Sequence, residues 1–143
     1  MNAEIKIIRE QTLSDLIKSS FQLTPIESTI LDNAQKLSYT TWAGFYDGKL
    51  VCTWGIVTPS ILSDSVYLWL HTTPHVKDYQ FIFVRRSQLF IEGLLREYRY
   101  VVGHVKKDEP RSQRWLKWLG AEFSSSREVG LLNFRIVSKW QTQ

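Results

Sequence analysis

Apolar and polar residues along the first quarter of the chain alternate and then repeat at helical spacing. Residues 4–10 (EIKIIRE) alternate and predict a strand. Residues 12–23 and 24–37 carry apolar residues three and four positions apart, which predicts two helices. The second helix has Pro25 at its first turn. Its predicted core face consists of Ile26, Ile30, Leu31 and Ala34.

The pattern changes to strands in residues 40–72. Two β-prone runs are joined at Asp47-Gly48, a dipeptide that accepts the positive φ values of a tight hairpin turn. A third extended run follows at residues 65–72 (SVYLWLHT). We expect these three segments to form an antiparallel meander.

The second half of the chain returns to helical spacing and then alternates with strands. Residues from about 78 to 99 predict a long helix, whose stripe is Val84, Ile91, Leu95 and Tyr98. A buried strand is expected at residues 98–105. A second helix, at residues 108–119, opens with acidic residues and a proline and ends at Gly120. Residues 121–140 predict a closing hairpin.

Composition is that of one globular domain. A chain of 143 residues with 43% hydrophobic content can bury a core, and no linker, repeat or low-complexity tract divides it. We therefore expect a single domain over residues 1–143. The longest apolar runs are too short to span a membrane, and the first residues lack a secretory leader pattern. The expectation is a soluble chain that stays where it is made.

Cysteine and charge narrow the candidate chemistry. Cys52 is the single cysteine, which excludes an internal disulfide and a cysteine-built metal site, and its strand context predicts a buried thiol. No metal is expected. The net charge of +4 favours encounters with acidic partners, but no dense Lys/Arg block indicates nucleic acid. The sequence leaves the oligomeric state open.

The helix at residues 108–119 carries two tryptophans among basic residues (RSQRWLKWLGAEF). Trp115 shares a face with Leu116 and is expected to pack in the core. A different stripe is formed by Arg111, Arg114 and Trp118, residue types that are frequent in binding hot spots. This stripe predicts either a partner surface or an edge tryptophan covered by its own arginines.

The order of elements, together with three motifs, resembles a known family. The motifs are WAGFYDGKLVCTWGIVTP, LWLHTT and RSQRWLKWLGAEF. The order is similar to that of the GCN5-related N-acetyltransferase (GNAT) fold, and the motifs resemble the GNAT-like internal virion protein A family of short-tailed phages. The resemblance implies an α+β fold, with a mixed, mainly antiparallel twisted sheet flanked by about four helices. It also implies a part in building the phage particle or its internal complex.

The resemblance implies an acetyl-CoA site as well, and this sequence departs from its pattern. GNAT enzymes hold the pyrophosphate on backbone amides at the start of the long helix, where glycines allow close approach. The matching residues 75–88 contain no glycine, and bulky residues such as Tyr79, Phe81 and Phe83 are expected to crowd a phosphate. The family's tyrosine acid falls on Leu116 and its asparagine on Glu109.

A base for acetyl transfer is nevertheless present. His71 ends the third strand of the meander and could act as the catalytic base; it could equally be a polar residue at a strand end. His75 and His104 are expected to be structural or exposed. No HExxH, Gly-x-Ser-x-Gly or Walker motif occurs. If the chain binds acetyl-CoA, the expected contacts are Leu70, His71, Tyr79, Gln80 and Glu109.

Three functions stay open from the sequence. The first is a GNAT-shaped protein without efficient catalysis and without a cofactor, which contacts other phage virion proteins during assembly or inside the virion. The second is an acetyl-CoA-dependent N-acetyltransferase that acts on an amine. The third is a small binding module directed at a host protein. The resemblance implies a location in the virion or in the host cytoplasm.

Overall fold

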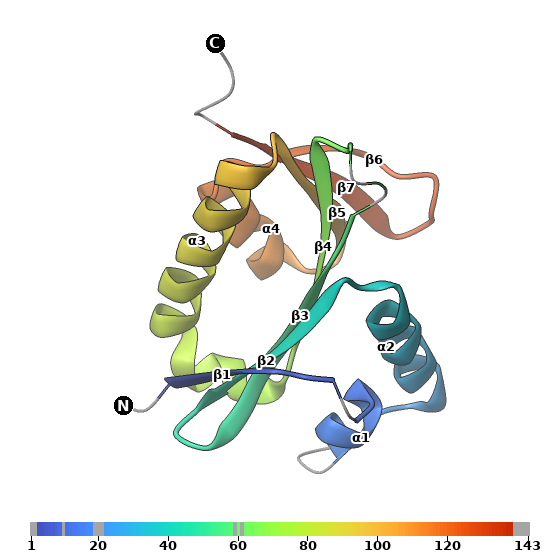
Figure 1. The fold of residues 1–143 in the computed structure, drawn as a ribbon, viewed down its shortest axis with the longest axis vertical. Coiled ribbons are helices and arrows are strands. Elements are labelled where there is room, and N and C mark those ends of the chain that lie inside the picture. The colour runs from blue at the N-terminus through green and yellow to red at the C-terminus, as the bar shows by residue number, and fades with distance from the viewer. Residues whose placement is uncertain (1–2, 10, 19–21, 59, 61, 139–143) are drawn as a thin grey trace. The chain divides into compact units, whose positions relative to one another are not determined.

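Seven strands form one mixed sheet in the order β1-β2-β3-β4-β5-β7-β6 (Figure 1). The computed structural model describes residues 3–9, 11–18, 22–58, 60 and 62–138. The chain folds as two compact units, one of residues 1–57 and 69–80 and the other of residues 58–68 and 81–143. Strand β4 (Ser65–Thr72) gives its first half to the second unit and its last half to the first.

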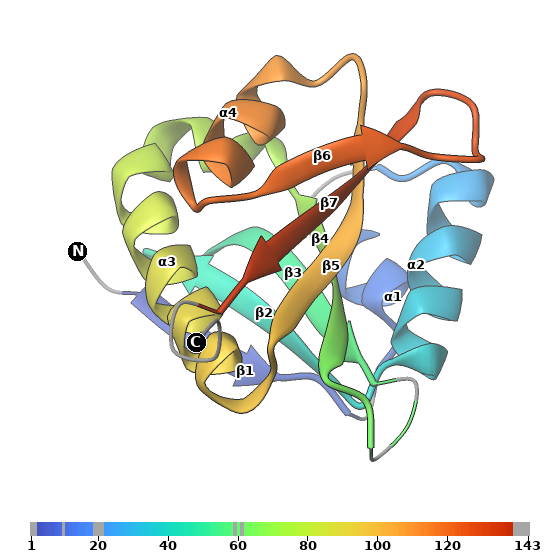
Figure 2. The same ribbon diagram turned by 90° about the horizontal axis from the view of Figure 1, so that it is seen from above.

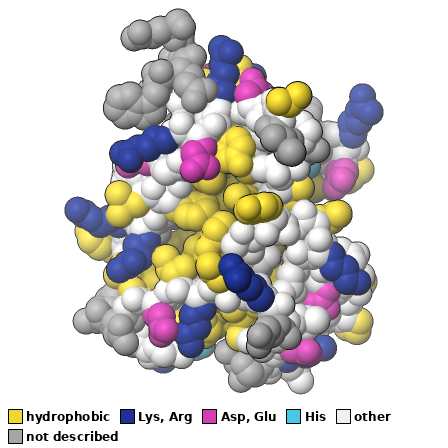
Figure 3. Space-filling model, in the orientation of Figure 1, with side chains coloured by type: hydrophobic (Ala, Val, Ile, Leu, Met, Phe, Trp, Pro, Cys, Tyr) yellow, Lys and Arg dark blue, Asp and Glu magenta, His cyan; other side chains and the backbone are white. Residues whose placement is uncertain are grey.

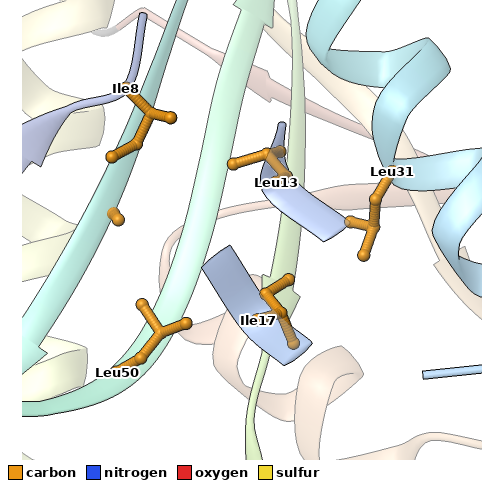
Figure 4. Close-up of a cluster of buried hydrophobic side chains, with 6 residues drawn as sticks. Ile8, Leu13, Ile17, Leu31 and Leu50 are labelled. Atoms are coloured by element: carbon orange, nitrogen blue, oxygen red, sulfur yellow. The ribbon is translucent and has the colours of Figure 1, made fainter. Parts of the chain in front are cut away.

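The first unit is an antiparallel sheet with two helices packed on it. Its strands are β1 (Ala3–Ile7), β2 (Thr40–Tyr46) and β3 (Lys49–Val57), and its helices are α1 (Leu13–Lys18) and α2 (Pro25–Leu37). Figure 4 shows the apolar cluster between them, which consists of Ile8, Leu13, Ile17, Leu31, Ala43 and Leu50. Burial of these aliphatic side chains holds the helices on the strands.

Helix α2 contacts α1 through polar groups as well as through Leu31, and its predicted core face is only partly buried. Asp32 accepts hydrogen bonds from the backbone nitrogen and hydroxyl of Ser14, and the Gln35 Oε1 accepts one from the Leu13 nitrogen at 2.9 Å. These bonds turn the polar side of α2 towards α1. Leu31 is buried as predicted, but Ile26 and Ile30 are 73% and 62% exposed, so their assignment to the core was wrong.

The hairpin between β2 and β3 has the predicted turn. Asp47 and Gly48 adopt φ values of 52° and 77°, the left-handed conformations that a two-residue hairpin loop requires. Cys52 on β3 is buried, as expected, and burial raises the pKa of its thiol to about 12. The thiol therefore stays protonated at neutral pH and packs as a small apolar group.

The second unit combines a long helix, a short helix and the last strands (Figure 2). Its elements are α3 (Gln80–Glu97), β5 (Tyr100–Lys106), α4 (Pro110–Trp118), β6 (Glu122–Ser125) and β7 (Leu131–Val137). β4 pairs with β5 in parallel, and β7 pairs antiparallel with both β5 and β6. The parallel pairing of β4 makes the sheet mixed rather than purely antiparallel. The predicted α+β class and element order are confirmed.

The long helix begins and faces the core differently from the prediction. A 3-10 helix, η1 (Pro74–Tyr79), precedes α3 directly, so helical backbone starts at Pro74 rather than near Asp78. The buried residues of α3 are Phe83, Ile91 and Leu94. Of the predicted stripe, Ile91 is buried, whereas the other members are half-buried.

Charged side chains do not gather on the face shown in Figure 3. Lys and Arg lie singly among acidic and uncharged residues there. Within the described part of the chain, none of the helices has the length and apolar character of a membrane span.

Candidate functional site

Thr73 lies in the turn between β4 and η1 and makes the hydrogen bonds that fix this turn. Its side chain is 2% exposed, and its hydroxyl donates a hydrogen bond to the Leu50 carbonyl oxygen at 2.6 Å. Its backbone nitrogen donates to the Val51 oxygen at 2.8 Å. These bonds fix the end of β4 to β3 inside the first unit. The sequence analysis missed Thr73, although Thr73-Pro74 repeats the Thr24-Pro25 pattern that starts α2.

The start of η1 has no spare backbone donor in its first three positions. Pro74 lacks an N–H, the His75 nitrogen donates to the Thr73 Oγ1 at 3.3 Å, and the Val76 nitrogen donates to the Thr73 oxygen at 3.0 Å. A helix can bind an anion at its N-terminus because its first N–H groups lack partners. Here, Thr73 and proline leave none of these three groups available.

Helix α3 follows η1 directly, without a break in the helical backbone. Gln80, which follows η1, has φ −55° and ψ −45°, and α3 begins at this residue. Inside a continuous helix each N–H group faces a carbonyl three or four residues earlier. The helical φ and ψ of Gln80 therefore predict that its own amide faces a carbonyl of η1.

The predicted acetyl-CoA contacts in the first unit lie on β4, on η1 and at the first residue of α3. Leu70 is 37% exposed and His71 is half-buried on β4, while Gln80 is exposed. Tyr79 is fixed to the β2–β3 hairpin: its ring meets the Tyr46 ring edge-on, with centroids 5.5 Å apart. Partial burial and the neighbouring Asp47 carboxylate raise the pKa of the Tyr79 phenol.

The phenylalanines at the start of α3 do not act as the sequence suggested. Phe83 is buried in the second unit, where its ring meets Trp115 edge-on with centroids 5.7 Å apart. Phe81 is 81% exposed. Both were predicted to crowd a phosphate, and Phe83 instead serves the core. The backbone donors of the turn are consumed by Thr73 rather than shielded by these rings.

The start of α4 differs from that of η1. Glu109 is exposed and precedes Pro110, but its side chain makes no capping hydrogen bond to the helix. The carboxylate instead accepts a bond from the Ser112 hydroxyl at 3.3 Å and lies 3.8 Å from the Lys106 ammonium. Leu116, which stands at the position of the family's tyrosine, is buried with 3% exposure.

The two tryptophans of α4 divide as predicted: Trp115 packs against the fold and Trp118 is exposed. Trp115 is half-buried, and its Nε1 donates to the Ser87 hydroxyl at 3.0 Å. Trp118 is 58% exposed, and Arg111 and Arg114 are exposed beside it on the helix. Trp115 therefore belongs to the fold. The assignment of Arg111, Arg114 and Trp118 to a partner surface stays a prediction.

The second unit also contains a hollow of about 550 Å³ on one face of its strands, lined by both polar and apolar side chains. The strand register brings together Tyr67, His104, Asn133, Arg135, Glu122 and Ser124. The Tyr67 hydroxyl lies 2.9 Å from His104 Nδ1. Burial, and then the charge of Glu128, raise the pKa of the Tyr67 phenol, so this hydroxyl can donate to the imidazole at neutral pH.

An ion pair neutralises the opposite side of this hollow. Arg135 Nη2 lies 3.2 Å from Glu122 Oε2, and the guanidinium stands 5.2 Å from the centroid of the Tyr100 ring. The sequence analysis missed this hollow because its residues come from four strands and meet only through the register of the sheet. Among the residues that the structure describes, no three His, Cys, Asp or Glu side chains form a metal site.

The strand order and the sequence of helices define the GCN5-related N-acetyltransferase (GNAT) fold, and comparison with solved structures agrees. A Bacillus subtilis acetyltransferase in complex with CoA has a TM-score of 0.69 at 9% identity, over 95% of this chain and 99% of that chain. The predicted GNAT fold is thereby confirmed. No family model matches the sequence, and no curated protein is similar to it in sequence.

Two further solved structures share the fold. An IAA acetyltransferase from Bacillus cereus has a TM-score of 0.66 at 10% identity, over 95% of this chain and 99% of that chain. The Campylobacter jejuni N-acetyltransferase PseH in complex with acetyl coenzyme A has a TM-score of 0.62 at 13% identity, over 96% and 100% of the two chains. At sequence identities this low, the structural similarity establishes the shared fold alone.

Proposed function

We propose that this chain is a GNAT-fold protein that acts by binding other proteins and does not transfer acetyl groups efficiently. One observation carries the proposal: Thr73 accepts the first two N–H groups of η1, and Pro74 has none. A GNAT enzyme needs donors at this turn for the cofactor pyrophosphate. Hydrogen bonds to a charged group contribute about 1.5–3 kcal/mol each, so a turn without them loses most of its affinity for a diphosphate.

The role that we propose is in a phage particle or its internal complex. The motif resemblance of residues 42–59, 68–73 and 111–123 to internal virion proteins supports this role. The protein would then be found in the virion or in the host cytoplasm, in contact with other virion proteins. The exposed side of α4, formed by Arg111, Arg114 and Trp118, is the contact surface that we assign to these partners.

Calorimetry with acetyl-CoA tests the first half of the proposal. We expect no saturable heat at cofactor concentrations up to the millimolar range. A dissociation constant in the micromolar range would contradict the proposal, since it would require a diphosphate site that the turn does not provide.

A pull-down of virion proteins with the immobilised chain tests the second half. Trp118→Ala should reduce the recovery of partners at least about tenfold, the typical effect of truncating a hot-spot tryptophan. Leu89→Ala, at an exposed leucine on α3, serves as the control. If Trp118→Ala leaves every interaction intact, the α4 surface is not the interface. Recovery of a host protein in place of virion proteins would favour the host-directed module.

Acetyl transfer to an amine is the second candidate function. It is favoured by the shared fold, since the B. subtilis and C. jejuni neighbours are complexes with CoA and acetyl-CoA. In that case, Leu70, His71, Tyr79, Gln80 and Glu109 would be the candidate contacts, with His71 as the base. Acetyl-CoA turnover that His71→Ala abolishes and His75→Ala retains would establish this function against our proposal.

A further inference from the structure

We propose that the outer edge of β1 pairs with β1 of a second copy of this chain, giving a two-fold symmetric antiparallel dimer. Among the residues that the structure describes, β1 stands at one end of the strand order, with one edge paired to β2 and the other edge open. An open strand edge is a template for another strand. This inference goes beyond the proposed function and does not depend on it.

The register of β1 with β2 determines which backbone groups point outwards. The Ile8 nitrogen donates to the Thr41 oxygen at 2.9 Å, so residue 8 has its N–H towards β2. Hydrogen-bonding direction alternates along a strand, and residues 6 and 4 therefore also face β2. The N–H and C=O groups of Ala3, Ile5 and Ile7 point to the open side, where they can form six bonds with a second copy.

Charge selects one register among the two-fold arrangements. Centring the dimer on Ile5 places Glu4 opposite Lys6 of the second copy, twice by symmetry. Centring it on residue 4 would place Glu4 opposite Glu4, and centring it on residue 6 would place Lys6 opposite Lys6. Opposite charges stabilise a cross-strand pair and like charges destabilise it, so the arrangement centred on Ile5 is favoured.

The geometry of this register brings the charges close together. When residues 3, 5 and 7 form the hydrogen-bonded pairs, Glu4 and Lys6 of the second copy form non-hydrogen-bonded pairs, whose side chains are the nearer ones. Within one chain the two side chains already lie on the same face, with Lys6 Nζ 3.8 Å from Glu4 Oε1. Both are more than half exposed and are available to a second copy.

The other face of β1 is apolar and fits the same register. Ile5 and Ile7 are 48% and 50% exposed in the single chain. The dimer centred on Ile5 would place Ile5 against Ile5 and Ile7 against Ala3 of the second copy. On one face of the strand opposite charges meet, and on the other face apolar side chains meet. Such self-complementary surfaces are typical of two-fold contacts between identical chains. β6 (Glu122–Ser125), at the other end of the strand order, carries a single charge and offers no such self-complementarity.

Sedimentation equilibrium over a concentration series tests the dimer. The wild-type chain should move from monomer to dimer as its concentration rises. Glu4→Lys and Lys6→Glu each replace two attractive pairs with two repulsive ones and should raise the dimer dissociation constant at least about tenfold. Glu92→Lys, a charge reversal on an exposed position of α3, should leave it unchanged.

Mixing the two charge variants gives the decisive result. The Glu4→Lys chain and the Lys6→Glu chain should each stay monomeric alone and should form a heterodimer together, because every cross-strand pair is then opposite in charge. The double variant E4K/K6E should dimerise like the wild type. A wild-type chain that stays monomeric at millimolar concentration, or charge variants that dimerise as well as the wild type, would overturn the proposal.

Discussion

Helical segments η1 and α4 both have a proline as their first residue, but the residue before the proline acts differently in the two segments. At Thr73-Pro74, the threonine is buried, caps η1 and bonds to the neighbouring strand. At Glu109-Pro110, the glutamate is exposed and makes no capping bond. Hydrogen bonds of its N-cap residue therefore stabilise η1 at its first turn. Helix α4 lacks such a side-chain cap and is stabilised by other contacts.

Helix α4 is held along its buried side and at its C-terminal end. Leu116 and Trp115 pack into the second unit, and Gly120, with φ 94°, closes the helix. The Gly120 nitrogen donates to the Lys117 oxygen and the Ala121 nitrogen to the Leu116 oxygen, both at 3.0 Å, which forms a Schellman motif. Because Thr73 caps η1, the first N–H groups of η1 are not available to an anion. Because α4 is stabilised by its buried side and its C-terminal end, its exposed side is available to a partner.

The largest expected effect is the difference in the free energy of unfolding between Trp115→Ala and Trp118→Ala. Trp115→Ala removes the contact with Phe83 and the bond to Ser87, and we expect a loss of about 3 kcal/mol in the free energy of unfolding. Trp118→Ala removes an exposed side chain and should change this free energy by less than about 0.5 kcal/mol. Urea denaturation measures both. Equal losses would mean that Trp118 also holds the fold.

Removing the hydroxyl at position 73 should give the next largest effect. Thr73→Val keeps the shape but removes the bond to the Leu50 oxygen and the cap on His75, with an expected loss of about 2–3 kcal/mol. Thr72→Val is the matched control, because Thr72 is the preceding residue, is exposed at the end of β4 and should tolerate the change within about 0.5 kcal/mol. Thermal denaturation of the two variants side by side checks the prediction. A Thr73→Val chain as stable as the control would show that this start does not depend on its cap.

Adding a cap to α4 should give the smallest effect, with the opposite sign. Glu109→Ser supplies a hydroxyl where the glutamate makes no capping bond, and we expect a gain of about 0.5–1 kcal/mol. The loss of the ion pair with Lys106 offsets little of this gain, since both groups are exposed. A destabilised Glu109→Ser chain would indicate that the carboxylate stabilises the helix start by another route.

Local signals predicted the features that depend on a few neighbouring residues. The Asp47-Gly48 turn follows from residues that accept positive φ, and Gly120 ended α4 for the same reason. The division between Trp115 and Trp118 followed from helical spacing alone. Each of these features depends on residues that are only a few positions apart in the sequence.

Features that depend on contacts between distant segments could not be predicted. Periodicity placed Ile26 and Ile30 on one stripe but could not show that Ser14 would bind the polar side of α2 through Asp32. The hollow beside Tyr67 and His104 required the register of four strands. The 3-10 start of the long helix was hidden because PHVKDY is short and mostly polar.

The availability of the amides at the start of η1 can be measured directly by NMR. Coenzyme A is titrated into the ¹⁵N-labelled chain while the backbone resonances of residues 75–79 are followed. Because Thr73 accepts the His75 and Val76 N–H groups, these resonances should show no saturable shift up to millimolar coenzyme A. Saturation at micromolar concentration, with the largest shifts at His75 and Val76, would contradict the account.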